Sequence, residues 1–410
     1  MLLPHLYYLE RYRNKGTRTY SNQSSYTEAA DSYRPDSDNE QFDLKVLKLP
    51  KDLLNIYLAN PPQTLKDRYI GKQEVNFCVH PQLLDPSQSD PFLTSYLPLT
   101  KQIDAIPVIP SSSTRTLFVL EQEAEHAVKV HFPFKVSRYT RKMRDEVVEQ
   151  AINVSSELEN NISKMSNDFS FLREVIGISF KEERGAINER GENWGFVIRD
   201  MQPFPQVEEP RALIPGFALY GEDYYDKDIT PLLYDLIGTD NPKTFVLDNI
   251  MLPIIRHWVD CFRHFGYLME PHGQNVLIEI DQANRITRIV HRDLSVGIDM
   301  RRRRDIGLSD EGLNDYNRME QGAFHSIAYD RFMGNHFFTR LVECCTARYP
   351  QLNKEDFTRP CQQEFARRLP EYRNYFPKNV WYFSEERDKY NKPLYEDTGV
   401  LPEWRPADDY

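Results

Sequence analysis

Apolar and polar residues alternate in short stretches between residues 44 and 135, the pattern of half-buried strands joined by loops. Two of these stretches, residues 114–120 and 127–132, flank an acidic turn at residues 121–125 and predict an antiparallel hairpin. The N-terminal stretch has no such period and mixes Ser, Tyr, Asn, Asp and Pro. We therefore expect a flexible segment over residues 1–43.

The spacing becomes helical after this hairpin. Residues 144–165 carry apolar side chains every three or four positions with charges between them, which predicts an amphipathic helix. A second helix is expected over residues 248–265, with Asp248 as its N-cap and Gly266 as its stop. Pro253 falls inside this window and predicts a later start or a kink.

A second hairpin is predicted from residues 276–280 and 286–290, which flank a short polar turn. Because the outer ends of a hairpin meet in space, we expect Glu270-Pro-His-Gly-Gln-Asn275 to lie beside His291-Arg-Asp293. From Gly307 onwards the pattern predicts helices with connections rich in tyrosine and proline.

The chain has 410 residues, which is too long for one small core. The patterns above place it in the α+β class. They divide it into the flexible segment 1–43, a β-rich lobe over residues 44–175, and a lobe over residues 176–410 that holds the second hairpin and the C-terminal helices.

The charge balance disfavours nucleic acid and anionic membranes as partners, because 51 Lys and Arg face 62 Asp and Glu, a net charge of −11. One basic run, residues 301–304, is followed by Asp305 and is interpreted as a solvated loop. No stretch approaches the roughly 18 apolar residues of a membrane helix. We expect neither nucleic acid nor membrane as a partner.

The cysteines are odd in number, scattered, and without the paired spacing of zinc ligands. The N-terminus lacks the charged-then-apolar order of a signal peptide. We expect reduced thiols and a cytoplasmic location. The five cysteines are Cys78, Cys261, Cys344, Cys345 and Cys361.

The motif at residues 270–275 groups a carboxylate, an imidazole and two amides around one glycine, a density of short polar groups that core packing rarely selects. A turn stapled by its own side chains is the alternative. Across the hairpin, Arg292 and Asp293 add a guanidinium and a second carboxylate. Glu270 and Asp293, converging at one place, would suit Mg²⁺ bound together with nucleotide phosphates.

A second group begins at residues 111–116, Ser-Ser-Ser-Thr-Arg-Thr, which enter a predicted strand. Hydroxyls and backbone amides there are suited to phosphate, with Lys129 on the pairing strand as a point charge and Arg115 or Arg141 as a carboxylate clamp. A simple turn is the alternative. Outside both groups, His80 is interpreted as a structural histidine.

Together these segments resemble the IucA/IucC family of siderophore synthetases. That family carries, in this order, Ser-Ser-x-Arg-Thr, a Lys followed eight residues later by Thr and twelve later by Arg, Glu-x-His-Gly-Gln-Asn, and Arg-Asp. The resemblance covers residues 75–400, with spacings that agree. The matching segments here are Ser112 to Thr116, Lys129 to Arg141 with Ser137 at the usual threonine, Glu270 to Asn275, and Arg292-Asp293.

The resemblance implies a hand-like fold with a mixed or antiparallel sheet in a nucleotide-binding lobe and a helical C-terminal lobe. It also implies an AMP-forming ligase, and a homodimer. With ATP and Mg²⁺ such an enzyme adenylates a carboxylic acid, citrate or a similar polycarboxylate, and joins it to an amine or alcohol in siderophore-type biosynthesis.

The resemblance also implies roles by position. ATP would face Ser113, Arg115, Thr116, Lys129, Gln274 and Asp293. The metal would be held by Glu270, Asn275 and Asp293. The acid would contact Ser137, Arg141 and His272, and the catalytic groups would be His272, Arg141 and Lys129.

One departure concerns the N-terminal lobe of the family, whose His-Pro-x-x-Lys-x-x-x-Gly segment is not found here. We expect a shortened homologue that lacks most of that lobe, an incomplete gene product, or a chain whose activity is lost or supplied by a partner.

Two other functions compete with the synthetase. A non-catalytic or partner-dependent relative would bind nucleotide or polycarboxylate without turnover. A protein-kinase interpretation starts from His291-Arg-Asp-Leu294, but it requires Asn five residues after the Asp, where this chain has Ile298, and a glycine-rich loop that the sequence lacks.

Overall fold

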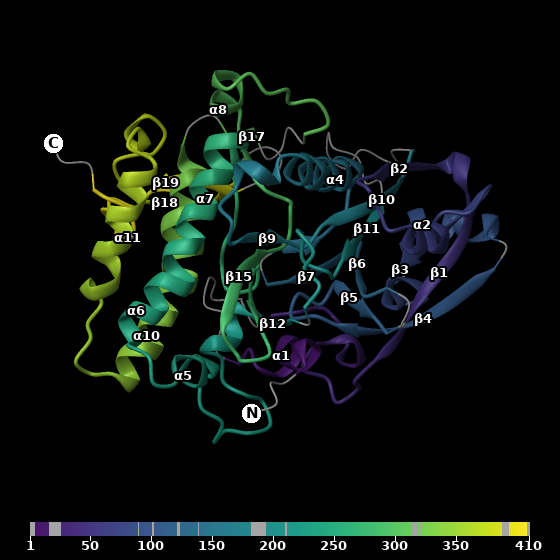
Figure 1. Cartoon of the computed structure of the whole chain (residues 1–410). Coiled ribbons are helices and arrows are strands. Elements are labelled where there is room, and N and C mark those ends of the chain that lie inside the picture. The colour runs from purple at the N-terminus through teal and green to yellow at the C-terminus, as the bar shows by residue number, and fades with distance from the viewer. Residues whose placement is uncertain are drawn as a thin grey trace.

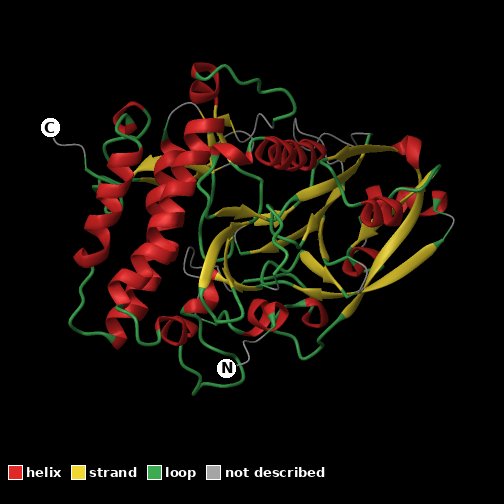
Figure 2. Ribbon diagram, viewed as in Figure 1, coloured by secondary structure: helices red, strands yellow, loops and turns green. Residues whose placement is uncertain are grey.

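The computed structural model of the chain is α+β, with sheets on one side and a helical part on the other (Figure 2). Among the helices it describes, none is long and apolar enough to cross a membrane. The described residues are 5–15, 26–88, 90–100, 102–120, 124–137, 139–181, 194–209, 211–313, 318–319, 322–387 and 393–407.

The larger sheet has eight strands, and each neighbouring pair is antiparallel. The predicted first hairpin is confirmed, since its two strands pair with Thr116 opposite Lys129. Of its acidic turn, residues 121–123 lie outside the described residues. In spatial order the strands are β2 (Leu54–Leu58), β10 (Glu174–Phe180), β11 (Gly195–Asp200), β6 (His126–Val130), β5 (Thr116–Val119), β4 (Ile103–Pro110), β1 (Phe42–Pro50) and β3 (Glu74–Val79).

Helices cover both faces of this sheet at β10. Ile176 and Ile178 point into a core that is closed by α2 (Gln63–Tyr69) and α3 (Pro91–Tyr96). Gly177, between them, faces α4 (Asp145–Asn160), which is the predicted amphipathic helix. A Cβ at Gly177 would lie 2.6 Å from a methyl group of Val148, so the glycine lets α4 approach closely.

The sheet extends further along the chain than the expected lobe boundary at residue 175. Strands β10 and β11 belong to it and end at Asp200. Both strands are buried along their whole length, so they lack the alternation of apolar and polar residues that marks a strand with one solvent-exposed face. The boundary prediction missed them for this reason.

The second predicted hairpin is confirmed as β14 (Val276–Ile280) and β15 (Ile286–His291), with Val276 opposite His291. It lies in a four-stranded sheet between β12 (Ala212–Pro215) and β9 (Phe169–Phe171), of which β9 runs parallel to β15. The outer ends of the hairpin therefore meet, as expected.

The helical part contains α7, α10 and α11, which run side by side in Figure 1. The predicted helices after residue 307 are confirmed, whereas the hairpin β18–β19 was not predicted. The elements are α5 (Leu232–Ile237), α6 (Pro242–Val246), α7 (Leu252–Phe265), α9 (Ala323–Ser326), the π-helix η9 (Ile327–Phe338), α10 (Thr339–Arg348), α11 (Glu355–Arg368), β18 (Trp381–Arg387), β19 (Pro393–Asp397), and a small sheet of β13 (Tyr267–Leu268), β16 (Gly297–Asp299) and β17 (Arg318–Met319).

The helix expected over residues 248–265 begins earlier and is divided. Asp248 is not its N-cap, because the chain enters through α6, capped by Asn241, and then a π-helical turn over Leu247–Met251. Pro253, which has no amide hydrogen to donate, is the second residue of α7, just after the π-helical turn, so the irregularity lies where the proline removes a helical hydrogen bond. Gly266, at φ 69°, ends the helix as predicted.

Residues 301–304 were interpreted as a solvated loop but form most of the helix α8 (Met300–Asp305). Arg303 is buried, and it donates hydrogen bonds to the carboxylate of Glu157 and to the carbonyl of Phe265. Charge runs are commonly solvated, but here neighbouring acceptors satisfy the guanidinium.

The N-terminal segment contains ordered structure where flexibility was expected. Residues Leu6–Tyr12 form α1, in which Leu9 and Glu10 are fully buried. Arg11 donates hydrogen bonds to backbone carbonyls of Pro35, Ser37, Asn39 and Glu40. Its polar residues thus find partners inside the fold, which composition alone does not reveal. The remainder of the flexible-segment prediction, at residues 1–4 and 16–25, lies outside the described residues.

Two buried histidines next to strands of the larger sheet make the stability of the fold sensitive to acid. Burial lowers the pKa of His80 and of His131 to about 3. His80 accepts a hydrogen bond from the backbone of Gln82, in agreement with its structural interpretation, and His131 accepts one from Met143. Both therefore stay neutral in the folded protein while the unfolded chain takes up protons below a pKa of about 6.5.

The free energy of unfolding should accordingly fall by about 1.4 kcal/mol per histidine between about pH 7.5 and about pH 5.5. Urea unfolding at the two pH values measures this loss. His131→Asn keeps an acceptor for the backbone amide of Met143 but cannot titrate. The variant should therefore lose about 1.4 kcal/mol less of its free energy of unfolding than the wild type between the two pH values. An unchanged pH dependence in the variant would contradict this assignment.

Candidate active site

A pocket forms where the large sheet, the second hairpin and the helical part meet. Eight of the predicted site residues line it, namely Ser113, Arg115, Thr116, Lys129, Arg141, His272, Gln274 and Asp293. The other lining residues are Asn14, Ser112, Val136, Phe217, Tyr220, Gly273 and His336. The sequence motifs, far apart along the chain, thus converge on one cavity.

Lys129 and Asp293 form an ion pair across the two lobes. The ammonium of Lys129, on β6, lies 2.6 Å from a carboxylate oxygen of Asp293, just after β15. Lys129 has a side-chain exposure of 3%, whereas that of Asp293 is 31%, so the free face of the carboxylate points to the cavity. Burial opposes ionisation of Asp293, but Lys129 and then Arg199 hold its pKa well below the usual range.

The turn over residues 111–114 presents hydroxyls to the cavity in a strained conformation. Thr114 has φ 70°, which is rare for a β-branched residue. The hydroxyls of Ser113 and Ser111 are hydrogen-bonded to each other, and the hydroxyl of Ser113 also accepts a hydrogen bond from the backbone amide of Thr116. Strain of this kind is found at many binding sites, and the functional interpretation of the turn stays a prediction.

Two arginines add positive charge next to this turn. Arg115 donates a hydrogen bond to the carbonyl of Arg141, on β8 (Tyr139–Arg141), which pairs with β7 (Phe132–Val136). Burial and then the charge of Arg141 lower the pKa of Arg115 to about 10. Two guanidinium groups that line one cavity, with the charge of one acting on the other, are suited to a ligand with several negative charges.

The predicted metal ligands are only partly brought together. Glu270 and Asn275 do not line the cavity. Burial and then the charge of Asp293 raise the pKa of Glu270 to about 8, so its carboxyl group lies within electrostatic reach of Asp293. Among the described residues no three His, Cys, Asp or Glu side chains form a metal site. Asp293 lines the cavity as an ionised carboxylate, whereas Glu270 would have to lose its proton to join it on Mg²⁺, a metal that is commonly held by one or two carboxylates together with substrate phosphates.

Ser137 does not line the cavity, although its neighbour Val136 does. Its backbone adopts φ 63°, and its hydroxyl is buried without a hydrogen-bond partner within the described part of the chain. The predicted contact of Ser137 with an acid therefore remains a prediction.

The two histidines of the cavity are neutral at physiological pH. Burial lowers the pKa of His272 to about 4 and that of His336 to about 3. The ring of His272 accepts a hydrogen bond from the backbone of Gln274. His336 comes from the π-helix η9, an irregularity that recurs at functional sites.

The sequence motifs did not identify several lining residues. Asn14 follows α1, Phe217 and Tyr220 follow β12, and His336 lies on η9. Phe217 and Tyr220 lie at the edge of an apolar stretch, and Asn14 and His336 carry no local signal. They reach the pocket only through tertiary packing.

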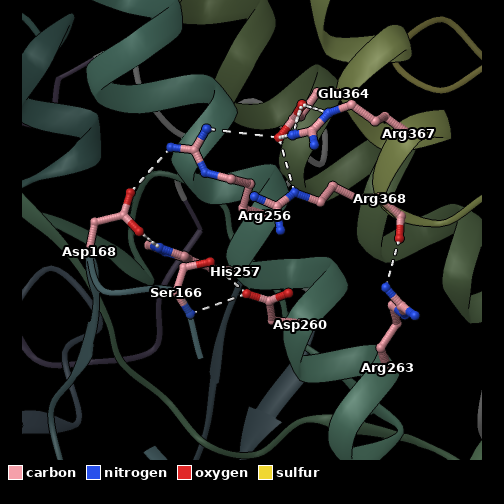
Figure 3. Close-up of polar contacts among 9 residues, drawn as sticks. All are labelled: Ser166, Asp168, Arg256, His257, Asp260, Arg263, Glu364, Arg367 and Arg368. Atoms are coloured by element: carbon pink, nitrogen blue, oxygen red, sulfur yellow. Dashed lines mark hydrogen bonds and ion pairs between the residues drawn. The ribbon is translucent and has the colours of Figure 1, made fainter. Parts of the chain in front are cut away.

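A polar network joins Asp168, just before β9, to α7 and α11 (Figure 3). His257, on α7, lies 3.1 Å from a carboxylate oxygen of Asp168 and 3.1 Å from the ring of His291, the residue before Arg292. Arg256 links Asp168 to Glu364 on α11, as Figure 3 shows. The network ties the end of β15 to two helices, so His257 has a structural part.

Comparison with known proteins gives a family and a fold. Residues 27–220 match the model of the IucA / IucC family. No curated protein matches the sequence.

Several solved structures share the fold at low sequence identity. The petrobactin biosynthesis protein AsbB from Bacillus anthracis str. Sterne is 14% identical, with a TM-score of 0.67 over 91% of this chain and 69% of that chain. Aerobactin synthetase IucC from a hypervirulent pathotype of Klebsiella pneumoniae is 13% identical, with a TM-score of 0.65 over 88% and 68%. ATP-bound aerobactin synthetase IucA from the same source is 14% identical, with a TM-score of 0.62 over 86% and 66%.

Proposed function

The chain belongs to the IucA/IucC family, and from this premise we propose that it is an ATP-dependent ligase that adenylates a polycarboxylic acid and condenses it with an amine or alcohol in siderophore-type biosynthesis. The observation that carries the proposal is the charge pattern of the cavity. Lys129, Arg115 and Arg141 line it together with the single ionised carboxylate of Asp293. Two bound anions, a nucleoside triphosphate and a polycarboxylate, would complement that pattern of charges.

The residues divide between the two substrates by position. The hydroxyls at residues 111–116 and the ammonium of Lys129 bind phosphate oxygens, and Arg115 lies beside them. Arg141 and the neutral ring of His272, which also line the cavity, bind the acid. This arrangement orients a carboxylate oxygen towards the α-phosphorus.

The chemistry proceeds in two balanced steps. The carboxylate oxygen attacks the α-phosphorus and pyrophosphate leaves, which gives an acyl-adenylate. The amine or alcohol then attacks the acyl carbon, loses its proton, and releases AMP. Asp293 and Glu270 would hold Mg²⁺, and the bound metal would neutralise part of the negative charge of the phosphates. The cations of the chain lower the barrier by positioning and by electrostatic stabilisation.

A hydroxylamine trapping experiment tests the proposal. The purified protein is incubated with MgATP, hydroxylamine and a panel of polycarboxylic acids, and hydroxamate, AMP and pyrophosphate are measured. We expect hydroxamate with at least one acid, with AMP formed in equal amount. Lys129→Met serves as the matched inactive variant, because it removes the phosphate-facing charge while keeping a long side chain.

Each alternative predicts a different outcome. MgATP binding without hydroxamate from any acid would replace the ligase with a non-catalytic binding protein. ADP in place of AMP would indicate phosphoryl transfer and would contradict adenylation.

A further inference from the structure

The helix α1 delivers a fully buried carboxylate to the back of the candidate site. Glu10 accepts hydrogen bonds from the backbone amide of Ser112 at 3.1 Å and from the hydroxyl of Ser112 at 2.7 Å. Its other oxygen lies 2.6 Å from the guanidinium of Arg292. The side chain has no solvent exposure.

These contacts join three segments that carry site residues. The hydroxyl of Ser112 accepts a hydrogen bond from the side-chain amide of Gln274. Arg292 donates one to the carbonyl of Gln274 at 2.6 Å, and its backbone amide bonds to Asn275. Glu10 therefore connects the hydroxyl turn, the loop at residues 272–275 and the residue that precedes Asp293.

Charge explains why a carboxylate is needed at this point. Arg292 is buried, and burial lowers its pKa, so its positive charge requires a partner inside the protein. Glu10 supplies that charge through one oxygen, and its other oxygen accepts both hydrogen bonds from Ser112. A neutral side chain would leave a buried guanidinium uncompensated next to the cavity.

The helix is held in place independently of Glu10. The ring of Tyr7 stacks on Phe118 of β5 at a centroid distance of 4.7 Å. Lys15 pairs with Glu222 through two backbone hydrogen bonds. Gly221 admits this crossing, because a Cβ there would lie 2.2 Å from the carbonyl oxygen of Arg13.

We propose that α1 is an integral wall of the active site and that Glu10 is a positioning residue, which holds the Ser112 turn and Arg292 in the geometry that binds the triphosphate. The inference rests on the proposed function for its ligand. The inference has a positional part, namely that Glu10 orders the turn at Ser112, and this part does not depend on bound nucleotide.

Glu10→Gln tests the inference by two measurements. Hydrogen exchange without ligand should accelerate at least tenfold at the amide of Ser112, since the single amide oxygen of the variant turns to the guanidinium of Arg292 and leaves an amide donor against the two donors of Ser112. MgATP affinity, measured by calorimetry, should fall about tenfold or more, as expected for loss of a charged hydrogen bond. Glu279→Gln is the matched control, because Glu279 is also buried and pairs with Arg288 at 2.5 Å, three residues along the hairpin from its site end.

A second variant separates positioning from folding. Gly221→Ala changes no charge but should displace the N-terminal segment, so exchange at residues 6–15 should rise and MgATP affinity should fall. Displacement of α1 in Gly221→Ala without loss of MgATP affinity would overturn the inference. It would also be overturned if Glu10→Gln kept wild-type hydrogen exchange at Ser112 and wild-type MgATP affinity, or if Glu279→Gln lost as much MgATP affinity as Glu10→Gln. A wild-type protein that does not bind MgATP would refute the proposed function, while exchange at Ser112 would still decide the positional part.

Discussion

Asp293→Asn is expected to lower MgATP-dependent turnover roughly a thousandfold, about 4 kcal/mol of transition-state stabilisation. The substitution removes the carboxylate that pairs with Lys129 and that faces the cavity. It leaves Lys129 without its counter-charge and removes one of the two carboxylates proposed to hold Mg²⁺. The effect should therefore appear in kcat, and the MgATP dependence should shift to higher Mg²⁺ concentration.

The variant should remain folded, because Asp293 is partly exposed and Asn keeps an oxygen that can accept the hydrogen bond of Lys129. Circular dichroism and thermal unfolding check this. Asp281→Asn is the control, since Asp281 lies in the turn of the same hairpin, at its far end from the cavity. Wild-type turnover in Asp293→Asn would remove this residue from the catalytic site.

Arg141→Ala is expected to raise the KM for the acid by about a hundredfold while changing the KM for ATP much less. Arg141 lines the cavity, donates a hydrogen bond to the carbonyl of Val136 and lies beside Arg115, which faces the phosphates. Loss of the guanidinium removes a bidentate contact to a carboxylate, and Lys129 and the hydroxyl turn remain for the nucleotide.

Initial rates with each substrate varied in turn measure the two KM values. Arg285→Ala is the control, because Arg285 is exposed and pairs only with Asp281 in a surface turn. Equal changes in both KM values would contradict the assignment of Arg141 to the acid. Lys at position 141 should restore part of the affinity, since it keeps charge but not the fork geometry.

Local patterns predicted the elements whose physical cause is local. The hairpin β14–β15 was predicted because its residues alternate around a polar turn, and its closure brings Asn275 next to Arg292. Gly266 ends α7 because a left-handed residue there suits glycine. The strands β10 and β11 were assigned to the wrong lobe, since burial on both faces removes alternation.

The candidate site was predicted in its charged and hydroxyl residues, which cluster in short motifs. Tyr220 and His336 were missed because each reaches the cavity through the packing of a separate element. Glu10 was missed for a stronger reason. In the sequence it belongs to no polar motif, and only its contacts with Ser112 and Arg292 show that it belongs inside.

The sequence by itself thus determined the α+β class, the two hairpins and most of the groups suited to phosphate and carboxylate, because periodicity and side-chain chemistry are local properties. Tertiary structure alone decided that Lys129 meets Asp293, that α1 closes the site, and that Arg292 is neutralised by Glu10. Those pairings depend on which buried charges lie within a few ångströms of each other, and distance along the chain does not encode that proximity.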